Sequence, residues 1–264
     1  MSHEKEKNGF GAYFMFFFLA AALSLISSPD IEAVVDSPYT FGAHRGSSVL
    51  FTENTLEAIK KAVEDTRYEF IEFDIQYTED KKIVVYHDLT LFRLQKKLLR
   101  ISNLTYEELS KMSSFHIPKY EEVMNTIGWK KKINIEIKSQ GNLESDKQLV
   151  DWIVADLETR GIIKETLLSS ISEEVVHYIK TKYPLIKVGQ IFWIVPATYA
   201  GDFFTERWYQ NVSENGADYL LLHGLNLRNY ENLLKLKPND KTLVFWFFND
   251  SMYVVHATKN DKMW

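Results

Sequence analysis

Residues 70–77 read Phe-Ile-Glu-Phe-Asp-Ile-Gln-Tyr, an apolar run that carries two acidic residues, Glu72 and Asp74, two positions apart. Successive side chains of a β-strand point to opposite faces, so this spacing places both carboxylates on one face. Two carboxylates that point together into an apolar interior repel each other and lose hydration unless a cation bridges them. The run therefore predicts a buried strand that carries part of a cation site.

Similar apolar runs recur along the chain and alternate with amphipathic stretches of helical period. The other runs are 40–46, 82–88, 133–138, 166–172, 187–195, 217–224 and 242–250, and the helical stretches are 54–64, 145–160, 172–182, 206–215 and 227–236. Strand followed by helix, repeated, predicts a parallel sheet, and runs rich in Val, Ile, Leu and Phe are typical of strands covered on both faces. So many units, without a G-x-G-x-x-G motif after the first strand, favour an α/β fold of the TIM-like (β/α) barrel type.

Composition excludes several classes of protein. The chain has 264 residues, 45% of them hydrophobic and 25% charged, which is ordinary for a globular protein and rules out a disordered, collagenous or coiled-coil chain. A net charge of -5 and the lack of a basic block predict no nucleic-acid partner. The chain contains no cysteine, which excludes a disulfide scaffold, a cysteine metal site and a cysteine nucleophile. The oligomeric state is left open.

The N-terminal part has a different character. Residues 10–26 are uncharged and almost entirely apolar, so they predict a hydrophobic helix that suits a secretory signal or a short membrane anchor, with a buried core helix as the alternative. Lysines precede this stretch and acidic residues follow it, which predicts export of the rest. We therefore expect a signal peptide or membrane anchor at 1–28, a linker at 29–39 and the barrel at 40–264. The protein would be secreted or membrane-anchored, with the barrel on the extracytoplasmic or lumenal side.

Polar residues collect where the predicted strands end. Glu136 and Lys138 end the run at 133–138 and share one face of it. Because the active site of a barrel lies at the carboxyl ends of its strands, Glu136 should join Glu72 and Asp74 there. Three oxygen ligands with open positions fit Mg²⁺ or Ca²⁺ better than a soft metal. The alternative for Glu72 and Asp74 alone is a solvated strand face.

Two histidines and an arginine share the same predicted rim. His44 and Arg45 end the first run, and His87 ends the third. Imidazole titrates near neutrality, so His44 and His87 are candidates for a proton-transfer pair. Arg45 and Lys138 would supply fixed positive charge to a phosphodiester, the arginine through two-pronged contacts. His223, at the end of the seventh run, is a further candidate for substrate contact.

The order of these residues resembles that of the glycerophosphodiester phosphodiesterase family. The matching motifs are A-H-R-G at 43–46, E-N-T-L-E-A at 53–58, I-E-F-D-I at 71–75, V-V-Y-H-D at 84–88, I-N-I-E-I-K at 133–138 and V-F-W-F-F-N at 244–249. The resemblance implies a barrel that hydrolyses a glycerophosphodiester to sn-glycerol 3-phosphate and an alcohol. It also implies an acid/base pair of His44 and His87, one divalent metal ion held by Glu72, Asp74 and Glu136, phosphate binding by Arg45 and Lys138, and a substrate wall that includes Trp246.

The sequence departs from the family pattern in several places. Thr52 replaces the usual proline before Glu53-Asn54, and we interpret Thr52 or Asn54 as a helix cap and Glu53 as a structural residue. Residues 92–102 (FRLQKKLLRIS) replace the family's R-T-T-x-G-x-G segment. The final helix and strand of the family are missing after residue 249. We therefore expect a barrel that lacks its last strand and leaves an unpaired edge.

These observations leave three hypotheses for the function. The first is a metal-dependent glycerophosphodiesterase. The second is a lysophospholipase D or sphingomyelinase-D-like enzyme acting on lysophospholipids, which the apolar segment at 10–26 and the aromatic residues Phe247 and Phe248 favour. The third is a truncated isoform of low activity that acts as a binding module, which the missing strand favours. A small-molecule or lysolipid phosphodiester is the expected partner, with membrane association through residues 10–26.

Overall fold

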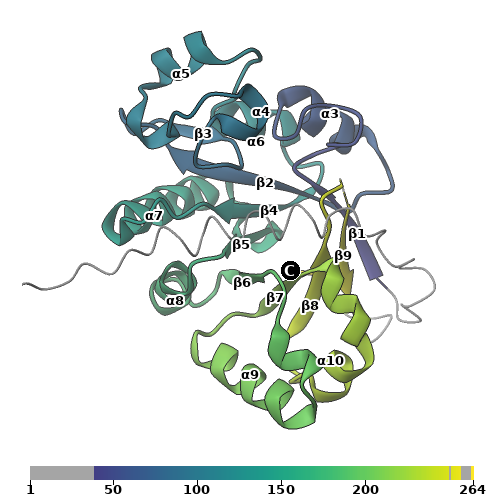
Figure 1. Cartoon of the computed structure of the whole chain (residues 1–264). Helices are drawn as coiled ribbons and strands as arrows, with labels where there is room; N and C mark the ends of the chain where they lie inside the picture. Colours follow the sequence, from purple (N-terminus) through teal and green to yellow (C-terminus); the bar gives the residue numbers. More distant parts are fainter. Residues whose placement is uncertain (1–38, 250, 257–262) are drawn as a thin grey trace, which may run out of the picture.

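The computed structural model describes residues 39–249, 251–256 and 263–264 (Figure 1). Its strands are β1 (Tyr39–His44), β2 (Phe70–Tyr77), β3 (Ile83–Val85), β4 (Lys132–Ile137), β5 (Thr166–Ser170), β6 (Lys187–Phe192), β7 (Tyr219–His223), β8 (Thr242–Trp246) and β9 (Ser251–Val255). Its α-helices are α3 (Leu56–Glu64), α4 (Phe92–Gln95), α5 (Tyr106–Met112), α6 (Tyr120–Ile127), α7 (Leu143–Arg160), α8 (Glu173–Lys182), α9 (Asp202–Glu214) and α10 (Tyr230–Leu236). The predicted signal or anchor at 1–28 and nearly all of the linker lie outside the described residues.

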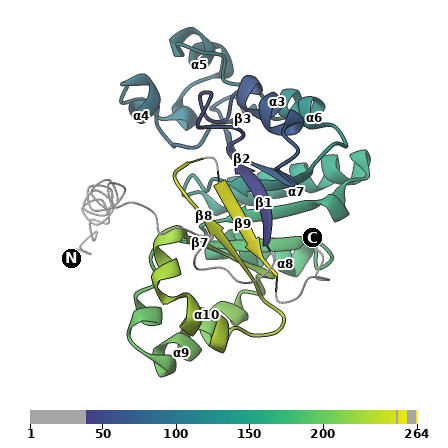
Figure 2. The ribbon, with the colours of Figure 1, turned by 90° about the vertical axis from the view of Figure 1, so that its right-hand side faces the viewer.

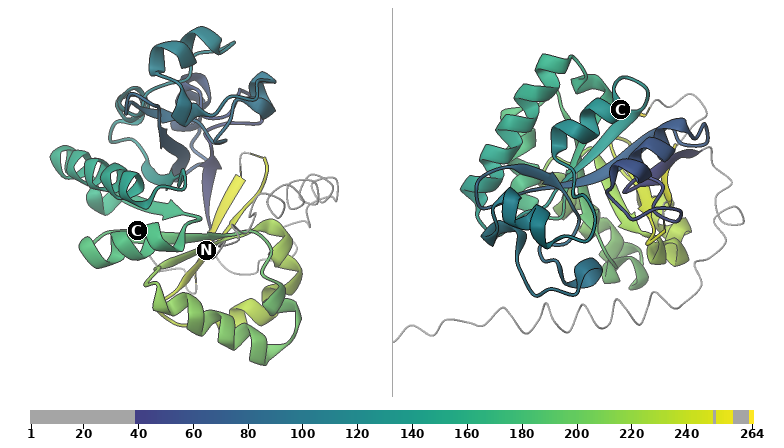
Figure 3. Two further views of the ribbon diagram at one scale, coloured as in Figure 1. Left: turned by 60° about the vertical axis from the view of Figure 1, so that its left-hand side comes forward. Right: turned by 90° about the horizontal axis from the view of Figure 1, so that it is seen from above.

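The strands close into a barrel. Hydrogen-bonded neighbours follow the order β1-β9-β8-β7-β6-β5-β4-β2, and β2 pairs with β1 to complete the ring. Seven strands of the ring, β1, β2 and β4 to β8, are parallel wherever two of them are neighbours. The helices lie outside the strands in both views of Figure 3. The predicted TIM-like barrel is therefore confirmed. No helix among residues 39–249, 251–256 and 263–264 is long and apolar enough to span a membrane.

The last strand differs from the expectation. Within residues 251–256 and 263–264 no helix or parallel strand follows β8, but the expected open edge is wrong, because β9 fills it. β9 pairs antiparallel with β8 on one side and with β1 on the other, and Figure 2 shows it beside β1. A tight turn after β8 suffices to place an antiparallel strand, whereas a parallel one needs a long crossover.

The third predicted strand is also placed differently. β3 pairs antiparallel with the end of β2, with Val85 opposite Ile75, and is not part of the ring. The connection from β2 to β4 therefore contains β3, α4, α5 and α6 and lies at the carboxyl end of β2. His87 follows β3 and is carried back toward Asp74, whose carbonyl accepts a hydrogen bond from the Tyr86 amide at 3.0 Å.

Local sequence signals account for the helix boundaries. α7 begins after Asn142, whose side chain accepts a hydrogen bond from the Ser145 amide, and ends at Gly161 in the left-handed conformation. α5 begins with a capping box formed by Thr105 and Glu108. α3 is capped by Thr55, so the expectation that Thr52 or Asn54 caps this helix is wrong.

The apolar core has three parts, of which the third lies within the connection from β2 to β4 and includes Tyr86, Leu91 and Leu109. The first and largest lies between the strands and the surrounding helices, and the second fills the barrel with residues such as Phe70, Leu221 and Val254. Gly42 leaves room for Phe70, because a Cβ at residue 42 would lie 2.1 Å from that ring. Trp264 packs against Phe70 and Tyr219 with ring centroids 5.0 and 5.4 Å apart. The barrel is thus packed beneath the polar residues at its carboxyl end.

Candidate active site

A cavity of about 380 Å³ opens at the carboxyl ends of the strands. Seven of the eight site residues proposed from the sequence line it: His44, Arg45, Glu72, His87, Glu136, Lys138 and Trp246. The eighth, Asp74, is fully buried next to Glu136 in the sheet. The structure therefore brings all eight together, although they come from five different segments of the chain.

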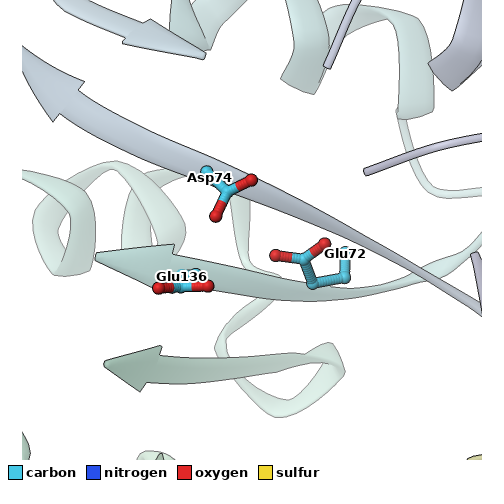
Figure 4. Close-up of side chains that lie close together, drawn as sticks. All are labelled: Glu72, Asp74 and Glu136. Atoms are coloured by element: carbon cyan, nitrogen blue, oxygen red, sulfur yellow. The ribbon is translucent and has the colours of Figure 1, made fainter. Parts of the chain in front are cut away.

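Three carboxylates form the floor of this site. Glu72 and Asp74 of β2 and Glu136 of β4 each offer an oxygen within 4.8 Å of the others, and Figure 4 shows the three groups close together on the two strands. Inward-pointing positions alternate along a strand, which explains why residues 72 and 74 share a face. Such a set of oxygen donors could hold a hard divalent cation.

The proximity of these groups shifts their pKa values. Burial, followed by repulsion from Asp74 and Glu136, raises the pKa of Glu72 well above its ordinary value. Burial raises the pKa of Glu136 to about 7, against the attraction of Lys138. Burial alone would also raise the pKa of Asp74, but Lys138, His87 and Arg45 together hold it well below its ordinary value. Negative charge is therefore in excess at Glu72 and Glu136.

Polar neighbours hold each carboxylate in place. The backbone amide of Arg45 donates to Glu72 Oε2 at 2.8 Å, and Asn54 Nδ2 donates to Asp74 Oδ2 at 2.7 Å. Lys138 Nζ lies 2.6 Å from Glu136 Oε1 and 3.2 Å from Asp74 Oδ1. Asn54 has a φ of 59°, a left-handed conformation that asparagine tolerates. Its side chain thus holds Asp74 of the candidate cation site and does not cap a helix.

The two imidazoles are oriented by different partners. His44 Nδ1 donates to the carbonyl of Phe247 at 2.6 Å, and its Nε2 lies 3.9 Å from Glu72 Oε2. His87 Nδ1 lies 2.6 Å from Asp88 Oδ1. Burial and then Arg45 lower the pKa of His44 to about 3, and burial and then Lys138 lower the pKa of His87 to about 4. Without substrate or metal, both imidazoles are neutral at neutral pH.

Arg93 was not identified from the sequence as a site residue. Its Nη1 and Nη2 donate to Glu53 at 2.8 and 2.5 Å, and its Nε donates to Asp88 Oδ2 at 2.7 Å. Glu53 also accepts from Arg45 Nη1 at 3.0 Å. Arg93 therefore links the partner of His87 to the partner of Arg45. One signal in the sequence could have identified this residue. Arg93 lies five positions after Asp88, in a segment that otherwise departs from the family pattern.

Aromatic side chains form the opposite wall. Trp246 lies between His44 and Trp193, with ring centroids 5.8 and 5.1 Å away, and Phe248 packs on Trp193 at 5.5 Å. His223 stacks against Trp193 and is not among the residues that line the cavity, so the prediction that it could touch substrate gains no support. Ile191 and Leu221 extend this wall into the barrel.

Comparison with known proteins gives consistent relatives. The sequence model of the glycerophosphoryl diester phosphodiesterase family matches residues 44–255. A glycerophosphodiester phosphodiesterase of Caldanaerobacter subterraneus is 29% identical over 161 residues, which cover 57% of this chain and 65% of that protein. One from Bacillus subtilis is 24% identical over 275 residues, which cover 89% of this chain and 90% of that protein. The chain spans just under two thirds of the length of the first of these relatives.

Solved structures share the fold. The glycerophosphodiester phosphodiesterase of Thermotoga maritima has a TM-score of 0.61 and 26% sequence identity, and the match covers 79% of this chain and 85% of that one. An Oleispira antarctica phosphodiesterase, solved in complex with sn-glycerol-3-phosphate, has a TM-score of 0.63 and 21% identity over 81% of this chain and 86% of its own. On the family match and this architecture, the chain belongs to the glycerophosphoryl diester phosphodiesterase family.

Proposed function

We propose that this protein is a metal-dependent phosphodiesterase that hydrolyses glycerophosphodiesters to sn-glycerol 3-phosphate and an alcohol. The observation that carries the proposal is a cluster of three carboxylates, two of which line a cavity together with two imidazoles, a guanidinium and an ammonium group. The named activity of the relatives and the product bound by the Oleispira protein support the same reaction. These groups match the needs of phosphodiester cleavage, which are charge neutralisation and proton transfer.

The carboxylates fit one divalent cation. Glu72, Asp74 and Glu136 would hold it, and their all-oxygen set favours Mg²⁺ or Ca²⁺. Burial and repulsion from Asp74 raise the pKa values of Glu72 and Glu136 even with Arg45 and Lys138 nearby, so a further cation would stabilise their ionised forms. A bound divalent ion would supply Lewis acidity toward the phosphoryl oxygens.

Arg45 and Lys138 would bind the phosphate. Arg45 Nε is buried and has no hydrogen-bond partner among the described residues, although Asp74 Oδ2 lies 3.6 Å away. A buried guanidinium N–H without an acceptor is costly, and a phosphate oxygen would satisfy it. Lys138 adds a second positive charge on the other side of Asp74. Together they would offset the negative charge on the phosphoryl oxygens in the transition state.

The partners of the two imidazoles indicate how proton transfer is divided. The Asp88 carboxylate lies beside Nδ1 of His87, and its negative charge stabilises the imidazolium form. Nδ1 of His44 instead contacts the neutral Phe247 carbonyl. We therefore assign His44 as the general base and His87 as the general acid. His44 Nε2 takes the proton of the attacking water or of the neighbouring glycerol hydroxyl. Binding of the anionic phosphodiester would favour the protonated form of His87, and as the P–O bond to the leaving group breaks, His87 would give its proton to the departing oxygen.

Lysophospholipids are the second candidate substrate. Trp193 and Trp246 line the cavity that also holds Arg45 and Lys138, and Phe248 packs on Trp193, so this side of the cavity is apolar. A mouse protein named lysophospholipase D GDPD3 is 39% identical over 72 residues, which are 27% of this chain and 22% of that one. The hypothesis of a low-activity binding module loses its main argument, because β9 closes the ring.

Secretion or membrane anchoring remains part of the proposal. It depends on residues 10–26, which lie outside the described part of the chain, and on the distribution of charge around them. The barrel would then act on the extracytoplasmic or lumenal side.

The proposed activity can be tested on the full chain with glycerophosphocholine and with lysophosphatidylcholine, with and without chelator. We expect metal-dependent release of sn-glycerol 3-phosphate from the first substrate. His44→Ala should lower the rate by about 10²- to 10⁴-fold, because it removes the base. His177→Ala, an exposed histidine on α8, is the matched control and should keep full activity. A folded, metal-loaded chain that turns over neither substrate would contradict both enzyme hypotheses.

Metal binding should depend on pH. Glu136, whose pKa is about 7, must lose its proton to act as a ligand, so affinity for Mg²⁺ or Ca²⁺ should fall by roughly tenfold per pH unit below neutrality. Titration calorimetry in buffers of different ionisation enthalpy measures both the affinity and the proton released. Asp74→Asn should weaken binding strongly, whereas Asp88→Asn, a nearby acid outside the triad, should not. Equal affinity at acidic and alkaline pH would refute the assigned ligand set.

The acid and base can be separated by the leaving group. On glycerophosphocholine, His87→Ala should lower kcat by about 100-fold or more, because an alkoxide needs a proton to leave. On the p-nitrophenyl ester of glycerol 3-phosphate, the kcat of the same variant should fall much less, since p-nitrophenolate leaves unprotonated. His44→Ala should lower kcat by the same factor on both esters. Equal losses for His87→Ala on the two esters would overturn the assignment.

Arg93 should act as a positioning residue. Arg93→Gln removes the contacts to Glu53 and Asp88, so we expect kcat to fall by about 10- to 100-fold with a smaller change in KM. Arg93→Lys should recover little of the lost kcat, because an ammonium cannot bridge two carboxylates as a guanidinium does. Arg100→Gln is the control, since Arg100 reaches the Gln140 carbonyl at 3.5 Å and not an acid. An Arg93→Gln variant with unchanged kcat would show that Asp88 orients His87 without help.

A further inference from the structure

Exposed hydrophobic side chains gather at one end of the barrel. Among the described residues, all but four of the large hydrophobic side chains that are exposed lie in connections that leave the carboxyl ends of the ring strands, or in the first turn of the helix that follows. The four exceptions are Tyr39, Trp129, Trp152 and Leu185. Scattered exposed hydrophobic residues are ordinary, but a collection around one opening marks an interaction surface.

Six of these residues define what we call the apolar rim. They come from the connections after β1, β2, β5 and β6, and their exposed fractions range from 40 to 84%: Leu50, Phe92, Leu98, Ile171, Ile194 and Phe203. Phe92 and Ile171 also line the cavity, so the rim begins at the mouth of the site. The residues protrude from separate connections around an opening.

Leu98 projects from a short hairpin-like excursion. The Leu91 amide donates to the Leu99 carbonyl at 2.9 Å, and the Ile101 amide donates to the Leu89 carbonyl at 3.1 Å. These bonds hold the two arms of the excursion together, and Leu98 near its end is 84% exposed. An exposed leucine on a hydrogen-bonded support is placed to enter an apolar phase without local unfolding.

Positive charge accompanies the rim on this excursion. Residues 89–103 contain four basic residues and no acidic one. Arg93 is neutralised by Glu53 and Asp88, but Lys96 and Lys97 contact only carbonyl oxygens, at 3.1 and 2.5 Å, in the part of the chain that the structure describes. Their charges are therefore not balanced by a neighbouring carboxylate.

We propose that the apolar rim docks on the surface of an anionic phospholipid bilayer. Apolar side chains flanked by lysine are the signature of interfacial binding, in which the side chains enter the acyl boundary and the cations meet the headgroups. A peptide or helix partner would need a continuous groove, whereas a bilayer accepts separate protrusions. Docking in this orientation turns the cavity toward the lipid. The consequence for substrate, that a lysolipid headgroup enters directly from the membrane, rests on the proposed function.

The natural lack of cysteine allows a direct test on the full chain. Leu98→Cys and Leu185→Cys each introduce one site for an environment-sensitive fluorophore. Leu185, 91% exposed in the turn between α8 and β6 at the opposite end of the barrel, is the matched control. With vesicles of phosphatidylcholine and phosphatidylserine, we expect a blue shift at residue 98 and quenching there by nitroxide-labelled lipid, with neither at residue 185. Adding Lys96→Gln and Lys97→Gln should weaken partitioning by roughly tenfold.

Several outcomes would overturn the proposal. The label at 98 could remain in water while the chain sediments with vesicles, in which case residues 10–26 alone anchor the protein. The label could be shifted before vesicles are added, which would mean that residues 10–26 or a second copy of the chain cover the rim. Equal shifts at 98 and 185 would indicate unspecific adsorption. Hydrolysis of soluble glycerophosphocholine, assayed on the same samples, reports on the proposed function separately from docking.

Discussion

The crowding of three carboxylates in a buried space is the constraint on which the rest of the site depends. Glu72, Asp74 and Glu136 are buried, which limits their hydration, so each negative charge needs a partner. Lys138 and Arg45 offset part of this charge, and the Asn54 amide satisfies one oxygen of Asp74. What remains uncompensated at Glu72 and Glu136 is the property that suits the site to a divalent cation.

A chain of alternating charges extends from this centre to the second imidazole. Arg45 lies between Asp74 and Glu53, and Arg93 bridges Glu53 to Asp88, which in turn holds His87. Cooperative networks of this kind fix side chains more firmly than isolated pairs. Asp74, a proposed metal ligand on β2, and His87, the proposed acid in the connection after β3, are therefore held by one network.

Closure of the barrel orients the other imidazole. The Phe247 amide donates to the Ser251 carbonyl at 3.2 Å in the turn into β9, and the Phe247 carbonyl accepts from His44. β9 also pairs with β1, the strand that carries His44. The same short strand thus completes the sheet and sets the tautomer of the proposed base, so the fold and the chemistry depend on one turn.

Local patterns in the sequence determined the barrel class, the residues that meet in the site and five of the helices, though not α4, α5 and α6, because strand alternation, capping residues and motif order can be read along the chain. The spacing of Glu72 and Asp74 is the clearest case. Only the tertiary structure decided the direction of β3, the closure by β9, the bridging role of Arg93 and the exposure of Leu98. Each of these depends on contacts between segments far apart in the chain, as when Gly42 pairs with Met252, and no periodicity within one segment encodes such a contact.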